Sequence, residues 1–194
     1  MMGWLGTTQV AAHAVALNLA SLAFMVPLGM SAAASARTGN LLGAGERWQA
    51  PGWVAIGLGA ASMSVSGSLF LLFPHALAHL YSDDPDVIAL AAGLLPMAAA
   101  LGFFDGVQAV SFGVLRGAGD VRVPSLFNVV GYWLVGLPLG AWLAFGAGWG
   151  PYGIWAGIVM ALFVVASLLV VRVRWTGRRG GRLVGRRAHQ STAS

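Results

Sequence analysis

Residues 123–171 read VPSLFNVVGYWLVGLPLGAWLAFGAGWGPYGIWAGIVMALFVVASLLVV and contain no Asp, Glu, Lys or Arg. A helix that crosses the roughly 30 Å hydrocarbon core of a bilayer needs about 20 mostly apolar residues, each rising about 1.5 Å. This stretch is too long for one crossing, and the Gly/Pro-rich segment at residues 146–153 divides it in two. It therefore predicts a pair of transmembrane helices.

Three further apolar stretches extend the pattern. The five expected spans are residues 10–36, 51–78, 87–115, 123–145 and 152–173. Of the 194 residues only 9% are charged, whereas a soluble domain carries about 25% to keep its surface solvated. The sequence therefore predicts an all-α membrane protein, with a polytopic helix bundle at 1–174. We expect the basic segment at 175–194 to be a disordered cytoplasmic tail.

The basic residues of the chain are all arginines, and they occur in three groups. The groups are Arg37 and Arg47; Arg116 and Arg122; and Arg172, Arg174, Arg178, Arg179, Arg182, Arg186 and Arg187. Five alternating spans place all three groups on one side of the membrane and the acidic loop SDDPD at 82–86 on the other. Because cytoplasmic loops carry the excess of Lys and Arg, we expect a multi-pass protein of the cell membrane with its C-terminus in the cytoplasm.

This topology has a consequence for the front of the chain. Met1 would lie outside, with too little ahead of the first span to drive export of the N-terminus. Residues 1–6 read MMGWLG and resemble the last turn of a helix whose beginning is missing. We therefore expect the chain to be truncated at its front, in the gene or in the assignment of its start codon.

Several kinds of function find no support in the residues. Cysteine is absent and the 4 histidines show no ligand spacing with acids, so we expect no metal site and no cofactor. No nucleophile and base are paired, so we expect no enzyme. The arginine-rich tail lacks the interleaved aromatic residues of a nucleic-acid site and is better explained as an anchor at anionic lipid.

Asp105 is the acid that lies inside a predicted span. It stands eleven residues before Arg116, which is about 16 Å along a helix and close to the middle of the bilayer. A charged side chain there costs on the order of 2.5–3.5 kcal/mol, so it normally faces a bundle interior or an aqueous cavity. Gln108 shares its helix face. We expect the pair to share a proton or to coordinate a cation, the alternative being a structural acid hydrogen-bonded to a neighbouring helix.

Other polar residues are weaker candidates. Asp83 and Asp84 could form a mouth that holds cationic solutes, or a solvated turn in which Ser82 or Asp84 caps the next helix. Asn18 and Asn128 are uncharged polar residues in apolar helices. Interhelical hydrogen bonds explain such residues adequately, and pore lining is the alternative.

Glycine forms two kinds of pattern. Residues 102–106, 136–140 and 153–157 match the G-x-x-x-G pattern of packed membrane helices, although chance matches are expected with 28 glycines. The loops at 42–47 and 116–122 share a Gly-Ala-Gly-acid core, 74 residues apart. That similarity indicates either a weak internal repeat or the ordinary chemistry of short turns.

Several segments together resemble the MATE family of multidrug exporters. Residues 11–18 (AAHAVALN), 24–27 (FMVP) and 34–45 resemble its eighth helix, residues 103–108 (FFDGVQ) and 113–120 its tenth, and residues 128–133 (NVVGYW) and 136–140 its eleventh. The match covers nearly all of residues 3–174 in the right order and spacing, so it is more specific than any single motif.

The resemblance implies a function for the chain as helices eight to twelve, the C-terminal lobe. The family has twelve helices in two lobes and exports cationic amphipathic drugs in exchange for sodium or protons by alternating access. By resemblance, Asp105 belongs to the cation-coupling site, and Gln108 on the same helix face is the further candidate for it. Asp83, Asp84, Asn18 and Phe104 are the candidates for substrate binding. The implied partners are the lipid bilayer, cationic amphipathic small molecules and the missing N-terminal lobe.

The chain also departs from the family. It lacks the seventh helix with its acid, and Leu101 stands where some relatives carry an aromatic hydroxyl. Because the first lobe is missing, we expect no transport by this chain alone. A flippase for lipid-linked saccharide precursors would need cationic residues in its cavity, and apart from Arg172 at the end of the last span no Arg lies inside any span. A non-transporting fragment or a half-transporter module is the third alternative.

The absence of cysteine allows a direct test of the expected orientation. In intact cells, a membrane-impermeant maleimide should label the Ser82→Cys variant and leave the Ser191→Cys variant unlabelled. Both variants should be labelled once the cells are permeabilised. The reverse pattern in intact cells would show that the arginine-rich side faces outward.

Overall fold

The structure, a computed structural model, describes the backbone of residues 6–191 and the side chains of residues 6–178. Its elements are α1 (Thr7–Gly43), α2 (Gln49–Leu72), α3 (Pro74–His79), α4 (Pro85–Gly117), α5 (Arg122–Val130), the π-helix η2 (Gly131–Gly136), α6 (Leu137–Ala141), the π-helix η3 (Trp142–Gly146) and α7 (Pro151–Ser191). In the described part of the chain, five helical stretches are long and apolar enough to cross a membrane. The prediction of an all-α membrane bundle with five spans is confirmed.

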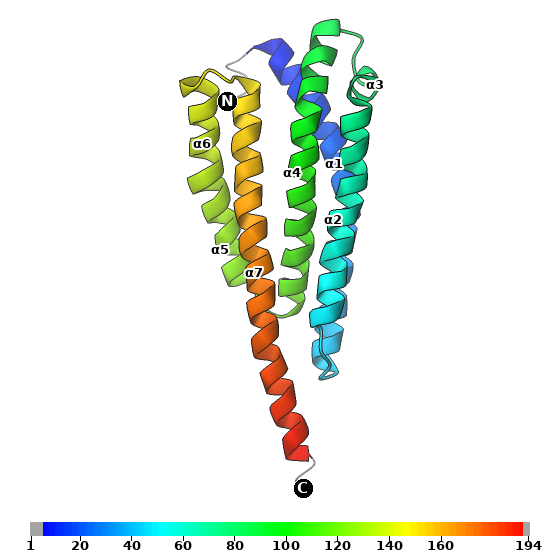
Figure 1. Cartoon of the computed structure of the whole chain (residues 1–194), viewed down its shortest axis with the longest axis vertical. Coiled ribbons are helices and arrows are strands. Elements are labelled where there is room, and N and C mark those ends of the chain that lie inside the picture. Colours follow the sequence, from blue (N-terminus) through cyan, green and yellow to red (C-terminus); the bar gives the residue numbers. More distant parts are fainter. Residues whose placement is uncertain (1–5, 192–194) are drawn as a thin grey trace.

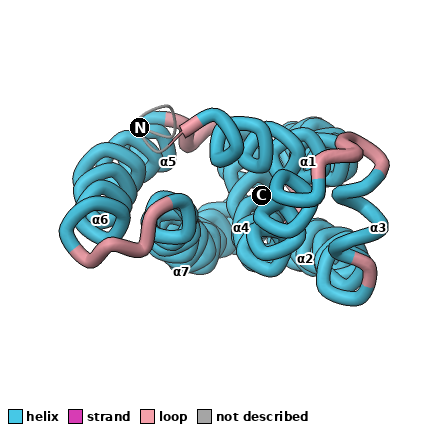
Figure 2. The backbone as a smooth tube through the Cα atoms, turned by 90° about the horizontal axis from the view of Figure 1, so that it is seen from above, coloured by secondary structure: helices cyan, strands magenta, loops and turns pink. Residues whose placement is uncertain are grey.

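The spans alternate in direction, as Figure 1 shows. The α1–α2 and α4–α5 turns and the C-terminus lie at one end, which holds the arginines and is called the basic end. The α3–α4 loop with its three aspartates lies at the opposite, acidic end. Viewed along the bundle, α4 lies between α7 on one side and α1 and α2 on the other, and α5 and α6 lie beyond α7 (Figure 2).

Two boundaries differ from the expected spans. The second span is not continuous to residue 78, because α2 ends at Leu72 and Pro74 opens the separate helix α3. Proline is favoured in the first turn of a helix, where its missing N–H has no partner to lose. At the other end, α7 continues as helix to Ser191, across most of the segment expected to be disordered. Extending a formed helix costs far less than nucleating one. Residues 1–5 and 192–194 lie outside the described part.

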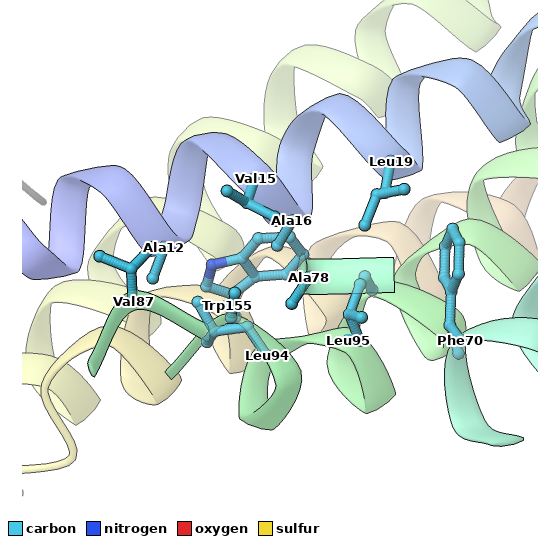
Figure 3. Close-up of a cluster of buried hydrophobic side chains, with 13 residues drawn as sticks. Ala12, Val15, Ala16, Leu19, Phe70, Ala78, Val87, Leu94, Leu95 and Trp155 are labelled. Atoms are coloured by element: carbon cyan, nitrogen blue, oxygen red, sulfur yellow. The ribbon is translucent and has the colours of Figure 1, made fainter. Parts of the chain in front are cut away.

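Trp155 of α7 is the centre of the main apolar cluster. Its side chain is fully buried, and in Figure 3 it lies between α1 and α4. Its indole Nε1 donates a hydrogen bond to Nδ1 of His13 on α1, at 3.2 Å. The buried members around it are Ala12, Val15, Ala16, Leu19, Phe70, Ala78, Val87, Ala91, Leu94, Leu95, Ala98 and Ala99. The cluster thus joins the first four helices to α7.

Glycines bring the helices into close contact at all three G-x-x-x-G patterns. A Cβ atom at Gly157 would overlap the Cα of Gly140, so α6 and α7 touch backbone to backbone. At Gly102 an added Cβ would meet the Cε of Met63 on α2 at 2.6 Å. Small residues allow such approach where lipid offers no hydrophobic drive for helix association. All three G-x-x-x-G patterns are therefore helix-packing sites in the fold.

The two similar turns end their helices in the same way. Gly45 and Gly119 have positive φ angles of 75° and 79°. The following amide of Glu46 donates to the carbonyl of Leu41 at 2.8 Å, and that of Asp120 donates to Leu115 at 2.9 Å. These are Schellman-type endings, for which glycine is the favoured residue. Helix termination is sufficient to explain the shared Gly-Ala-Gly core. Neither acid caps the next helix, because α2 and α5 have no side-chain cap.

Glycine packing predicts an asymmetry between two alanine substitutions. Gly157→Ala should lower the free energy of unfolding by about 1–3 kcal/mol, because the added methyl group overpacks the α6–α7 contact. Gly57→Ala should leave it unchanged or raise it, since nothing lies within 4 Å of its Cβ position and alanine favours helix. Unfolding in mixed detergent micelles measures both, and equal effects would contradict the assignment.

Candidate functional site

The structure joins the expected coupling residues on α4 to two residues of the neighbouring span. Nε2 of Gln108 donates to Oδ1 of Asn128 on α5 at 2.8 Å. The hydroxyl of Tyr132, on η2, lies 3.4 Å from the same nitrogen and 3.5 Å from Oε1 of Gln108. Gln108 is only 8% exposed. Two amides and one hydroxyl therefore form a polar cluster, Gln108–Asn128–Tyr132, between α4 and the α5–η2 span.

The local backbone explains how this span presents its polar face. Asn128 and Tyr132 are four residues apart and thus lie on one side of a helix. Tyr132 stands in the first turn of the π-helix η2, which begins at Gly131. A Cβ atom at Gly131 would overlap the side chain of Val165 on α7. Close packing on α7 thus fixes this turn while its other side meets α4.

Asp105 lies one helical turn from Gln108 and differs from it in being unpartnered. Its side chain is half-buried, and in the described part of the chain it has neither a hydrogen bond nor an ion pair. It lies near Tyr132 of the polar cluster. The alternative of a structural acid hydrogen-bonded to a neighbouring helix finds no support in this geometry. An ionisable residue inside an apolar span is a functional-site hypothesis by default, so the cation-coupling role of Asp105 stays a prediction.

The acidic loop serves as a helix start. Oδ1 of Asp84 accepts from the amide of Asp86 at 2.9 Å, and Pro85 is the first residue of α4. Asp83 is fully exposed, 3.8 Å from Nδ1 of His79. Along α4, Asp84 and Asp105 are about 30 Å apart. Capping explains Asp84, and the structure does not bring either loop acid to the coupling residues.

Asn18 and Phe104 lie apart from the polar cluster in different ways. Nδ2 of Asn18 donates to the carbonyl of Ala14 in its own helix at 2.9 Å, and the side chain is exposed. The ring of Phe104 makes edge-to-face contacts with Phe103 and, at 5.3 Å between centroids, with Phe163 of α7. Neither has a hydrogen bond or ring contact with Asp105 in the described part of the chain, so a substrate role for them stays a prediction.

Sequence reasoning missed Tyr132 as a member of this site. A tyrosine in an apolar span is commonly an interfacial anchor, and nothing in its neighbours distinguishes this one. The available signal is its spacing of four residues from Asn128, which places the two side chains on one face of a helix.

These features define a class of protein: a multi-pass helical membrane protein with one unpaired acid inside its bundle. The sequence profile of the MatE family matches residues 1–142, and the chain belongs to this family. The resemblance deduced from the residues is thereby confirmed.

Curated relatives agree with this family assignment. The multidrug resistance protein NorM of Burkholderia vietnamiensis is 48% identical over 178 residues, which are 88% of this chain and 38% of that protein. A probable multidrug resistance protein NorM of Mesorhizobium japonicum is 44% identical over 179 residues, 89% of this chain and 38% of that protein. The chain thus spans about two fifths of the length of these relatives.

Solved structures show the same fold. The eukaryotic MATE transporter AtDTX14 superposes on 90% of this chain with a TM-score of 0.79 and 27% identity, over 40% of its own length. An inward-facing multidrug resistance MATE transporter of the MOP superfamily superposes with a TM-score of 0.81 at 17% identity. The second likeness concerns the fold alone. Relatives and structural neighbours are transport or resistance proteins, in agreement with the expectation that the chain is not an enzyme.

The polar cluster predicts different effects for two asparagines. Asn128→Leu should lower the free energy of unfolding by about 1 kcal/mol. This value lies between the ~0.6 kcal/mol of an average interhelical hydrogen bond and the ~3 kcal/mol cost of a buried amide with no hydrogen bond. Asn18→Leu should not lower it, because that side chain is exposed and bonds only its own helix. Unfolding in micelles compares the two. Equal losses would show that Gln108 does not depend on Asn128.

Proposed function

We propose that this chain is the C-terminal lobe part of a cation-coupled multidrug exporter, in which Asp105 holds the coupling cation. The proposal rests on one observation: a carboxylate deep in a span has no partner of its own in the described chain, beside a cluster of oxygen-bearing side chains. Burying an unneutralised carboxylate is costly, so a cation that neutralises it gains that free energy.

The neighbouring groups suit either coupling ion. A proton needs only the carboxylate of Asp105. A sodium ion prefers several oxygen ligands, which the carboxylate, the amide oxygens of Gln108 and Asn128 and the hydroxyl of Tyr132 could provide. The hydrogen bond from Gln108 to Asn128 orients these amides before the ion arrives. The geometry therefore supports cation coupling without favouring one ion.

Coupling follows from charge neutralisation in a two-state protein. An ion shifts a conformational equilibrium only by its difference in affinity between the two states. With the cation bound, the charge of the Asp105 carboxylate is neutralised and the bundle can close around the site. With the cation released, the exposed charge favours the state in which water or a cationic drug reaches it. Exchange of the cation for the drug is then antiport by alternating access.

The proposed cargo is a cationic amphipathic drug. The names of the NorM relatives support a role in multidrug resistance. A net negative site with aromatic rings nearby attracts such molecules, and the aromatic residue Phe104 directly precedes Asp105 in the chain. Asp83 and Asp84 at the acidic end would then meet drug on release, if the basic end faces the cytoplasm as the arginines indicate.

Transport requires more than this chain in the proposal. The structure supplies five spans, whereas alternating access moves one bundle of helices against another around a midplane site. We therefore propose that the chain works with a further lobe, whether on the same polypeptide or a separate one. A flippase for anionic saccharide carriers is disfavoured, because no arginine of the described chain lines the polar cluster.

Neutralising Asp105 tests the proposal in the complete exporter. Asp105→Asn should lower drug efflux at least tenfold and remove its dependence on the cation gradient, because the variant cannot exchange a charge. Asp105→Glu should retain part of the efflux. Drug accumulation in cells, measured with and without an imposed sodium or proton gradient, gives both quantities.

Asp86→Asn is the matched control, since it removes the same charge from an exposed position at the acidic end. It should leave efflux and its gradient dependence unchanged. Efflux that remains intact and gradient-dependent in Asp105→Asn would overturn the assignment of the coupling site.

A further inference from the structure

A groove of about 520 Å³ lies between α1 and α2 toward the basic end. Its volume is within the range of about 300–1,000 Å³ that is typical of small-molecule sites. The wall on α1 includes Met30, Ala33 and Ala34, and the wall on α2 includes Val54 and Leu58. Val54 and Leu58 are 63% and 54% exposed. The groove is thus apolar and open at the surface of the described chain.

One charged residue, Arg37, lines this groove. Its side chain is exposed, and no hydrogen bond or ion pair joins it to another residue that the structure describes. Arg47 and one carboxylate, that of Glu46, lie in the turn that connects the two helices. The groove therefore has apolar walls and, at its basic end, a free guanidinium in a region of net positive charge.

This combination matches the chemistry of an anionic phospholipid. Such a lipid has acyl chains that fit an apolar groove and a phosphate that pairs with arginine. Basic pockets between membrane helices at the arginine-rich surface are where anionic headgroups bind. We propose that the α1–α2 groove binds one acyl chain of an anionic phospholipid, with its phosphate held by Arg37.

Charge decides against the drug as the occupant. A cationic amphipathic molecule would place its positive group beside Arg37, where repulsion opposes binding. The groove also differs from the polar cluster in its residues, since none of Asp105, Gln108, Asn128 or Tyr132 lines it. The lipid site therefore goes beyond the proposed transport function, and each can fail without the other.

Competition between two lipids in detergent micelles tests the proposal. The purified chain is mixed with equal amounts of phosphatidylglycerol and phosphatidylcholine, and native mass spectrometry counts the bound molecules. We expect about a fivefold preference for phosphatidylglycerol, the effect of one arginine near an anionic headgroup. Arg37→Gln should reduce the preference to about one. Arg122→Gln, which removes an exposed arginine outside the groove, should retain it.

A second pair of variants tests the groove itself. Val54→Trp fills it from an exposed position and should lower the binding of both lipids severalfold. Val65→Trp adds the same ring at a similarly exposed position of α2 that does not line the groove, and should have no effect. Equal losses in Arg37→Gln and Arg122→Gln would indicate diffuse surface charge and overturn the proposal. The proposal would also be overturned if the chain were a dimer and Val54→Trp dissociated it without reducing lipid binding. That result would show that a second copy of the chain occupies the groove.

Discussion

Helices in a bilayer gain little hydrophobic free energy from meeting each other, because lipid tails are as apolar as leucine. Their contacts must come from close backbone approach, and in this bundle glycine makes that approach possible. Gly157 against Gly140 joins α7 to α6, and Gly102 with Gly106 joins α4 to Met63 of α2. The position of the α5–η2–α6 span follows from these contacts. Because that span holds Asn128 and Tyr132, the polar cluster depends on glycines that never touch it.

Polar groups inside the spans show a clear division. The serines of α2 at positions 62, 64, 66 and 68 return their hydroxyls to carbonyls of their own helix, which is how such residues are satisfied in lipid. Ser31 of α1 donates to the carbonyl of Ala109 on α4 at 2.7 Å. At the basic end, Arg172 pairs with Asp120 at 2.6 Å. Inside the α4 span, the carboxylate of Asp105 and the fully buried hydroxyl of Ser111 have no hydrogen-bond partner in the described chain.

The sequence was sufficient for the spans and their alternation, because both depend on local composition and charge. Its limits lay where distant segments meet. The break after Leu72 depends on the weak preference of Pro74 for a helix start, which a hydropathy pattern hides. The contact of Gln108 with Asn128 and Tyr132 depends on the rotation of two helices about their axes, which is set by glycine packing of the α5–η2–α6 span on α7 and of α4 on α2. For the same reason, true and accidental G-x-x-x-G patterns were indistinguishable before the helices were placed.

The backbone contact between Gly140 and Gly157 also constrains how this gene can vary. Every amino acid other than glycine has at least a Cβ atom, so any missense change in either codon introduces new volume into a contact with no room for it. At an apolar core position, by contrast, one aliphatic side chain can often replace another with little loss. Natural variants of the chain should therefore be scarcer along the α6–α7 contact than in the apolar cluster around Trp155.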